Sequence, residues 1–433
     1  MNNANIQKLK NITAESLFGL DIDCEPPFAP IKITTQIHTE VGSFARLSEI
    51  SKGAGDGSVF LLSGEGLEEF DRQIIKNLSG EDISVKRVGK SVILNFDFAR
   101  LVQQAVPCNA KIIIATGGGA ICDLSKMLSK NLGIPLCFVP SAPTSDAMLS
   151  RFSVVNVGGT SQFLETKAPD FIVCDASECE NVPAKLVRAG FGDAVSNYLA
   201  VFDWMVAKDF FDRPFCKEIA YLAVASADKA VFAGEVYLKN KVHGIELMFD
   251  ALLLSSGAMA LMNESTPCCG GEHAVAIAIS KLADDNFMHG ESVFLAFCKL
   301  VEVYKLFFWG YSKGKYLPPD TAMRCEFLIE HFGVLEERAE SLCKMPISES
   351  EYKIIKEKYR ICKSRYAPNI TQLSKKIPHI KNIFFEIFDE DFEKFNLQSD
   401  IISKSIGIAP DIEDKFTTLT LMREFGLIDT LLV

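Results

Sequence analysis

The first third of the chain alternates short apolar runs with segments of helical period, and this alternation constrains the fold more than any other feature. SVFLLSGEG, DISVKRV, KIIIATGGG and IPLCFVPS read as strands, and IKITTQIH precedes them from residue 31. LEEFDRQIIKNL, FDFARLVQQAV and ICDLSKMLSKNLG lie between them with apolar residues at helical spacing. Strands that alternate with helices predict a parallel sheet with crossover helices.

From about residue 176 the pattern changes to long helical segments. They are KLVRAGFGDAVSNYLAVFDWMVAKDF, KEIAYLAVASADKAVFAGEVY, IELMFDALLLSSGAMALMNES, EHAVAIAISKLA and GESVFLAFCKLVEVYKLFF. The sequence therefore predicts a loosely held extension over residues 1–30, an α/β domain over residues 31–175 and an all-α domain over residues 176–433. Residues 337–396 are rich in Lys and Glu with a weaker apolar period, so we expect a peripheral helical insertion there, open to use as a partner surface.

Composition excludes several classes of protein. The chain has 433 residues, 48% of them hydrophobic, which is enough for more than one domain. Its net charge of -11 argues against a nucleic-acid partner. The start, MNNANIQKLKN, is too polar for a secretory signal, and we find no apolar run of membrane-span length. We therefore expect a cytoplasmic protein without a membrane span.

Thirteen cysteines are scattered along the chain, mostly inside apolar runs such as IPLCFVP and FIVCDAS. In a cytoplasmic chain of this length the pattern indicates reduced core thiols rather than a disulfide framework.

The stretch TGGGAICDLSK stands where a strand ends and a helix begins. Glycines in such a turn let a phosphate approach the backbone, and a helix N-terminus favours an anion. The spacing is not the GxGxxG fingerprint, since Ile121 stands in place of the last glycine, and no GK[ST] follows as in a Walker loop. A plain strand-to-helix turn is the alternative.

The next strand is followed by the polar loop VPSAPTSDAMLS. A loop at the carboxyl end of a parallel strand commonly lines a ligand crevice. The alternative for Asp146 is that it caps a helix beginning at Ala147. The polar residues that the loop offers are Ser141, Thr144, Ser145, Asp146 and Ser150.

One carboxylate and two imidazoles stand out in the helical half: Asp193 in RAGFGDAVSNY, His273 in STPCCGGEHAVAIAI and His289 in FMHGESV. Together they would suit a divalent metal with an open position for a substrate oxygen. Glu272 would orient one of these metal-binding side chains without itself contacting the metal. The alternative is that Asp193 is a helix cap and the histidines are packed core residues.

Taken together, these stretches resemble sn-glycerol-1-phosphate dehydrogenases, a family within the dehydroquinate-synthase-like and iron-containing alcohol dehydrogenase superfamily. TGGGAICDLSK is similar to the family's GGG-x-x-x-D-x-x-K turn, and VPSAPTSDAMLS to its V-P-T-A-A-S-H-D-G loop. AGFGDAVSNYLAVFDW resembles its A-G-F-G-D helix, STPCCGGEH its S-x-P-A-S-G-x-E-H segment, and HGESV its H-G-E-x-V. The resemblance covers roughly residues 35–330, and the tail DKFTTLTLMREFGL also resembles the family's closing segment.

The resemblance implies a dehydroquinate synthase-like fold and a metal-dependent, NAD(P)-linked oxidoreductase. An α/β N-terminal dinucleotide-binding domain would precede an all-α metal-binding domain, and the assembly would be a homodimer. The substrate would be a small phosphorylated ketone or polyol. NAD or NADP would bind at Gly117, Gly118, Gly119, Asp123, Ser141, Thr144 and Ser150. Asp146 and Asp193 would meet the substrate, and Asp193, His273 and His289 would hold one catalytic divalent metal, Zn²⁺, Ni²⁺ or Fe²⁺.

The chain departs from the family pattern around the substrate. Ile277 and Ser145 stand where the family has histidines, Ala147 where it has glycine, and Asn197 where it has lysine. We therefore expect a ketone or polyol phosphate other than dihydroxyacetone phosphate. Glu65, after the strand SVFLLSG, favours NAD over NADP because an acid near a ribose 2′-hydroxyl excludes the extra phosphate.

Two other functions stay open. A sugar-phosphate cyclase related to dehydroquinate synthase would keep NAD bound, but would need more basic residues around a phosphate than Arg151. A non-catalytic relative would bind nucleotide or a partner protein, but would have little need of a metal site.

Overall fold

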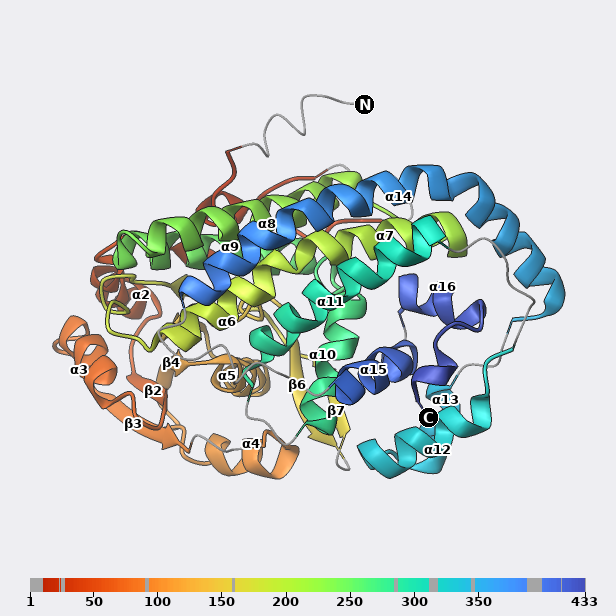
Figure 1. Ribbon diagram of the computed structural model, residues 1–433. Helices are drawn as coiled ribbons and strands as arrows, with labels where there is room; N and C mark the ends of the chain where they lie inside the picture. The colour runs from red at the N-terminus through yellow and green to blue at the C-terminus, as the bar shows by residue number, and fades with distance from the viewer. Residues whose placement is uncertain are drawn as a thin grey trace.

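A six-stranded parallel sheet forms the N-terminal half of the molecule (Figure 1). The computed structural model describes residues 11–22, 24, 28–89, 93–157, 160–283, 287–310, 318–343, 347–387, 399–413 and 415–432. The strand order is β1-β8-β5-β4-β2-β3, and β6 and β7 form a separate antiparallel hairpin. The strands are β1 (Gln36–His38), β2 (Ser58–Gly64), β3 (Ile83–Val88), β4 (Ala110–Gly117), β5 (Leu136–Pro140), β6 (Phe152–Val157), β7 (Thr160–Glu165) and β8 (Phe171–Val173).

The sheet lies between two apolar layers because alternate side chains of a strand point to opposite faces. Val59 and Leu61 of β2 pack into a cluster with Leu47 and Ile74. Phe60 and its alternate neighbours belong to the main core, which continues into the helical half. The crossover helices are α2 (Arg46–Gly53), α3 (Glu68–Asn77), α4 (Phe96–Gln103) and α5 (Gly119–Leu132). The predicted parallel α/β domain is confirmed.

The order of the strands reverses between β2 and β4. The chain runs from β2 to β3 on one side, returns to β4 on the other side of β2, and continues to β5. Ligands of open α/β sheets bind outside the carboxyl ends of the strands at such a reversal. This places the glycine turn after β4 at the expected crevice.

Helices make up the rest of the chain, as the sequence predicts, and the change from sheet to helices falls between β8 and α6. The domain boundary at residues 175/176 stays a prediction. The segment read as one helix over residues 185–210 is two, which meet at Ser196. The helices are α6 (Ala184–Val195), α7 (Asn197–Phe211), α8 (Lys217–Tyr237), α9 (Lys241–Met262), α10 (Gly271–Leu282), α11 (His289–Gly310), α12 (Thr321–Phe332), α13 (Glu336–Leu342), α14 (Glu349–Glu386), α15 (Ser399–Ile408) and α16 (Thr418–Glu424).

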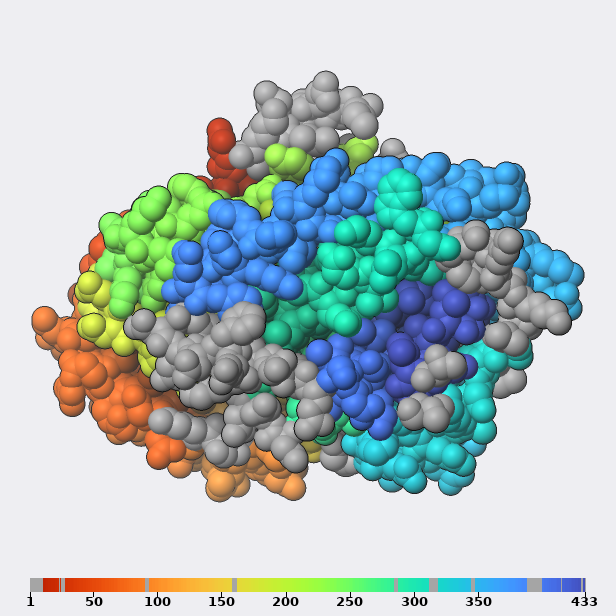
Figure 2. Space-filling model, in the orientation of Figure 1, coloured from red at the N-terminus to blue at the C-terminus, as the bar shows by residue number. Residues whose placement is uncertain are grey.

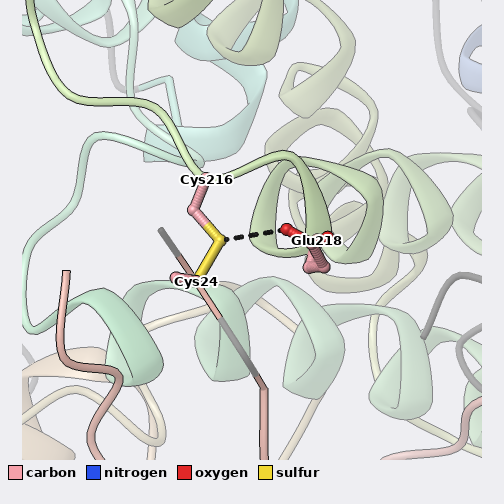
Figure 3. Close-up of side chains that lie close together, drawn as sticks. All are labelled: Cys24, Cys216 and Glu218. Atoms are coloured by element: carbon pink, nitrogen blue, oxygen red, sulfur yellow. Dashed lines mark hydrogen bonds between the residues drawn. A yellow bond between two sulfur atoms is a disulfide. The ribbon is translucent and has the colours of Figure 1, made fainter. Parts of the chain in front are cut away.

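The expectation of a loosely held N-terminal extension is wrong for its described part. Leu17 is fully buried, and Lys229 donates to the Ile12 carbonyl oxygen over 3.0 Å. Cys24 is joined by a disulfide to Cys216, at the start of α8, with Glu218 beside it (Figure 3). The expectation of reduced thiols therefore fails for this pair, while the other eleven cysteines are free.

Replacing Cys24 with serine is expected to loosen this segment, because the disulfide closes a loop with a sequence separation of 192 residues. Loss of such a cross-link lowers the free energy of unfolding by about 2–4 kcal/mol. Limited proteolysis followed by mass spectrometry should show faster cleavage before residue 36. Cys108→Ser, which changes an exposed free thiol, serves as the control. Equal cleavage of both variants would contradict the role of the disulfide.

The expectation of a peripheral insertion over residues 337–396 is also wrong for its described residues. Helix α14 begins with a capping box between Ser348 and Glu351. Its inner face buries Tyr359, Tyr366 and Ile380, and it packs against α7, α8 and α11. Figure 2 shows α14 lying beside α11 on the surface of the molecule. The helix is therefore part of the helical core, and its exposed Lys and Glu residues concealed that role in the sequence.

Helix α9 is long and apolar enough to cross a membrane by length and composition, and 83% of its most apolar window is buried inside the protein. The sequence expectation overlooked this run. Burial of this kind is typical of the central helix of a globular domain. No other helix among the described residues meets the same criterion.

Candidate active site

Three predicted metal ligands converge from three helices. Asp193 lies in the last turn of α6, His273 in the first turn of α10, and His289 is the first residue of α11. Their ligand atoms all lie within 4.8 Å of one another. Asp193 Oδ1 is 3.4 Å from His273 Nε2 and 3.9 Å from His289 Nε2. Asp193 therefore does not cap the start of a helix, and the two imidazoles are not packed independently in the core.

Two glycines bring the ligand-bearing helices together. A side chain at Gly192 would collide with the carbonyl oxygen of Gly290, and one at Gly290 would collide with that of Ala189. The backbones of α6 and α11 are thus in contact beside Asp193 and His289. A buried ion pair, with Arg188 Nε 2.9 Å from Glu291 Oε1, joins the same two helices.

The carboxylate of Asp193 is suited to a cation. Its Oδ2 accepts a hydrogen bond from the Asp146 backbone amide over 3.1 Å, whereas the buried Oδ1 has no hydrogen-bond partner among the described residues. Buried oxygens without a partner are rare in folded proteins. One carboxylate and two imidazoles are a common ligand set for Zn²⁺ and related metals. The His289 side chain is 53% exposed, so the site opens to solvent on that side.

Electrostatics at the site also favour a positive charge. Burial alone would raise the pKa of Asp193, but the neighbouring imidazoles of His273 and His289 lower it. Burial would lower the pKa of His273, yet Cys269, Asp193 and Glu272 hold it well above its usual value. Burial and the Asp193 charge raise the pKa of Asp146 to about 7. A bound metal ion would supply the positive charge that this cluster of carboxylates and imidazoles otherwise gains from protons.

Glu272 and Asp203 support the metal ligands from behind. Glu272 Oε1 lies 3.0 Å from His273 Nδ1, which leaves Nε2 facing Asp193. Asp203 accepts hydrogen bonds from the backbone amides of Gly271 and Thr418, over 2.9 and 2.8 Å. Asp203 therefore ties the start of α10 to the C-terminal tail. Its place in the family-like stretch VFDW was the only sequence signal for this role.

Replacing Asp203 with asparagine is expected to weaken metal binding by about 10–100-fold. Both carboxylate oxygens accept hydrogen bonds, and the amide nitrogen of asparagine would face one of the donors. Competition with a chromophoric chelator measures the affinity. Asp228→Asn, at a surface ion pair with Lys376, is the control. Wild-type affinity in Asp203→Asn would show that this network does not position His273.

The predicted cofactor loops meet at the ends of β4 and β5, which pair through Gly117 and Pro140. Gly117 has φ +153°, and a side chain there would collide with Ile121. Gly117, Gly118, Gly119 and Thr144 line one pocket together with Ser145. The Ser141 backbone amide donates to the Gly117 carbonyl oxygen over 3.3 Å, so Ser141 holds the two loops together.

Like Ser141, two other predicted cofactor residues do not line this pocket. Asp123 forms an ion pair with Lys126 over 2.8 Å and accepts from the Val154 amide, so its carboxylate fixes the β6–β7 hairpin. Ser150 lines a different cavity, and its hydroxyl accepts from the Phe152 amide. The resemblance could not show these local partners, and a cofactor role for either residue stays a prediction.

Asp146 links the glycine pocket to the metal site. No helix begins at Ala147, so Asp146 is not a cap. Its amide reaches Asp193, and its Oδ2 accepts from Ser255 Oγ over 2.5 Å. Asn197 donates to the same hydroxyl over 2.9 Å. Sequence reasoning missed Ser255, although it lies in the family-like SSGAM stretch.

Residues 39–183 match the family model described as iron-containing alcohol dehydrogenase. Over these residues the chain is similar to iron-containing alcohol dehydrogenases. The chain is also 30% identical over 224 residues to the glycerol-1-phosphate dehydrogenase [NAD(P)+] of Sulfurisphaera tokodaii, covering 52% of this chain and 63% of that protein. For the enzyme of the same name from Methanothrix thermoacetophila, the identity is 30% over 192 residues, covering 44% of this chain and 54% of that protein. The chain thus spans less than two thirds of the length of these relatives.

Two solved structures share the fold. Sulfoacetaldehyde reductase from Bifidobacterium kashiwanohense, in complex with NAD⁺, aligns with a TM-score of 0.61 at 12% identity, covering 95% of this chain and 98% of that one. An iron-containing alcohol dehydrogenase from Thermococcus thioreducens aligns with a TM-score of 0.59 at 14% identity, covering 94% of this chain and 99% of that one. The predicted dehydroquinate synthase-like fold is confirmed.

Proposed function

We propose that this chain is a metal-dependent, NAD(P)-linked oxidoreductase that interconverts a small phosphorylated ketone and its alcohol, in the manner of glycerol-1-phosphate dehydrogenases. The observation that carries the proposal is the buried, unpartnered Oδ1 of Asp193, which faces His273 and His289. The loop of Asp146 joins this site to the glycine pocket. A redox reaction needs this proximity, because hydride transfer occurs only between groups held in contact.

The roles of the residues follow from their positions. Gly117, Gly118 and Gly119 present the start of α5 to the cofactor's phosphates. Asp193, His273 and His289 would hold the metal, and Glu272 fixes the orientation of His273. When bound, the metal would polarise the substrate carbonyl and the nicotinamide would exchange hydride with its carbon. Asp146, held by Ser255, orients the substrate beside them.

Several finer points belong to the same proposal. Zinc suits two imidazoles and one carboxylate, and nickel or iron would bind the same set. Glu65 follows β2 at the strand reversal and favours NAD over NADP. The eleven free thiols fit a cytoplasmic location, and we expect a homodimer. Ile277, one turn after His273, presents an apolar side chain where the family has histidine, which supports a substrate other than dihydroxyacetone phosphate.

No specific observation favours the cyclase alternative or the non-catalytic one. Asn197, where a lysine would help a cyclase, is fully buried and bonded to Ser226 and Ser255. The direct experiment loads the protein with Zn²⁺, Ni²⁺ or Fe²⁺ and follows the absorbance of NADH and NADPH with a panel of ketone phosphates. We expect turnover with at least one ketone, and faster turnover with another ketone than with dihydroxyacetone phosphate. Absence of turnover with every metal and ketone would contradict the proposal.

A further inference from the structure

A cavity of about 210 Å³ lies between the β6–β7 hairpin and the end of α9, apart from the glycine pocket. Its hairpin side is formed by Arg151, Phe152 and Phe163, and its helical side by Met259, Asn263 and Glu264, among others. None of these residues belongs to the metal site or to the glycine pocket. The cavity combines an apolar wall with a cation.

We infer that this cavity binds an organic anion, a phosphate or carboxylate carried on an apolar body, and that it holds the end of the substrate furthest from the reacting carbon. The inference rests on the proposed function and names the class of substrate: one longer than a three-carbon phosphate.

The cation of the cavity is available to a ligand. Arg151 has one ion-pair contact among the described residues, to Glu165 at 3.9 Å, and the two side chains are 38% and 59% exposed. A surface pair of this kind holds a guanidinium weakly. The guanidinium therefore offers a fork for an anionic group.

One acidic group also lines the cavity. Burial raises the pKa of Glu264, while the charges of Lys415 and Arg213 act in the opposite direction. Burial thus disfavours the charged form of Glu264, and Arg151 is the cation among the side chains that line the cavity.

The hairpin supplies an apolar surface without a covering side chain. Phe163 is 63% exposed, and Val154, directly across the hairpin from it, is 41% exposed. Met259 and Phe152 face the same cavity. Covering an exposed phenylalanine by an apolar ligand removes hydrocarbon from water, which favours a ligand with a ring or an alkyl chain.

The position of the cavity relates it to the reacting groups. Ser255 of α9 binds Asp146, and Met259 lies four residues further along the same helix. With a rise of 1.5 Å per residue, Met259 is about 6 Å beyond Ser255, and Asn263 is about 12 Å beyond it. A substrate that reaches from Asp146 into the cavity therefore carries several atoms between its reacting carbon and its anionic end.

Calorimetric titration of the metal-loaded protein with phenyl phosphate and with inorganic phosphate tests the inference. We expect phenyl phosphate to bind at least about tenfold more tightly than inorganic phosphate. Arg151→Gln should weaken phenyl phosphate by about tenfold. Phe163→Ala should weaken phenyl phosphate severalfold and leave inorganic phosphate unchanged. Both side chains are partly exposed, so both variants should fold.

Matched controls are Arg46→Gln, at an exposed ion pair, and Phe96→Ala, at a phenylalanine 51% exposed on α4. The inference is overturned if phenyl phosphate binds no more tightly than inorganic phosphate, or if Arg151→Gln and Phe163→Ala bind it like their controls. Calorimetry measures binding without turnover, so the expected binding can be observed even if the proposed reaction does not occur. Conversely, the protein could turn over a ketone phosphate without showing this binding pattern. The proposed function would then hold, and the inference that the cavity binds substrate would be wrong.

Discussion

Replacing His273 with alanine is expected to remove the bound metal and to lower turnover by at least about a hundred- to a thousandfold. The imidazole is buried, it lies 3.4 Å from the unpartnered Asp193 oxygen, and Glu272 fixes its orientation. Without it, two ligands remain, one of them on the exposed side of the site. Metal content by elemental analysis and kcat with NADH and an active ketone phosphate measure the two effects.

The control for this variant is His243→Ala, at an exposed histidine of α9 that pairs with Glu246. We expect it to keep wild-type metal content and turnover. If His273→Ala retained one metal per chain and wild-type kcat, the three residues would not form the catalytic centre.

Replacing Gly290 with alanine is expected to destabilise the protein by about 3 kcal/mol, because the added methyl group would collide with the backbone of α6 at Ala189. Relief of this collision separates α11 from α6 and moves His289 away from Asp193. Metal affinity should therefore fall together with stability. Chemical denaturation of the metal-free protein and chelator competition measure the two effects separately.

Gly310→Ala is the matched control, since it lies at the other end of α11 with no atom within 4 Å of an added side chain. Alanine at such a helical position is neutral or stabilising. If Gly290→Ala were as stable as Gly310→Ala and bound metal as well, close backbone contact between α6 and α11 would not be what forms the site.

The sequence was sufficient to predict the sheet and the helical half because their apolar periods are strong. KIIIATGGG could only be a buried strand leading to a turn, and it is β4 with Gly117 at its end. The hairpin β6–β7 was missed because its residues alternate weakly and Phe163 faces outward. The N-terminal segment was misjudged because its anchors, Lys229 and Cys216, lie about two hundred residues away.

The convergence of Asp193, His273 and His289 was predictable because each stands inside a motif of the right order. The groups that position them were not, since their role depends on distant packing. Asp203 reaches both α10 and the tail, and Ser255 connects Asp146 to Asn197. Asp123 shows the opposite case, because the partners of this family-motif residue among the described residues are structural ones, Lys126 and the Val154 amide.

The central claim is that one divalent metal binds between α6, α10 and α11. Anomalous diffraction from crystals of the zinc-loaded protein, recorded on both sides of the zinc absorption edge, tests it most directly. The account predicts one strong peak per chain, about 2.0–2.2 Å from Asp193 Oδ1, His273 Nε2 and His289 Nε2. An anomalous map with no peak at these three atoms, at full zinc loading, would contradict it.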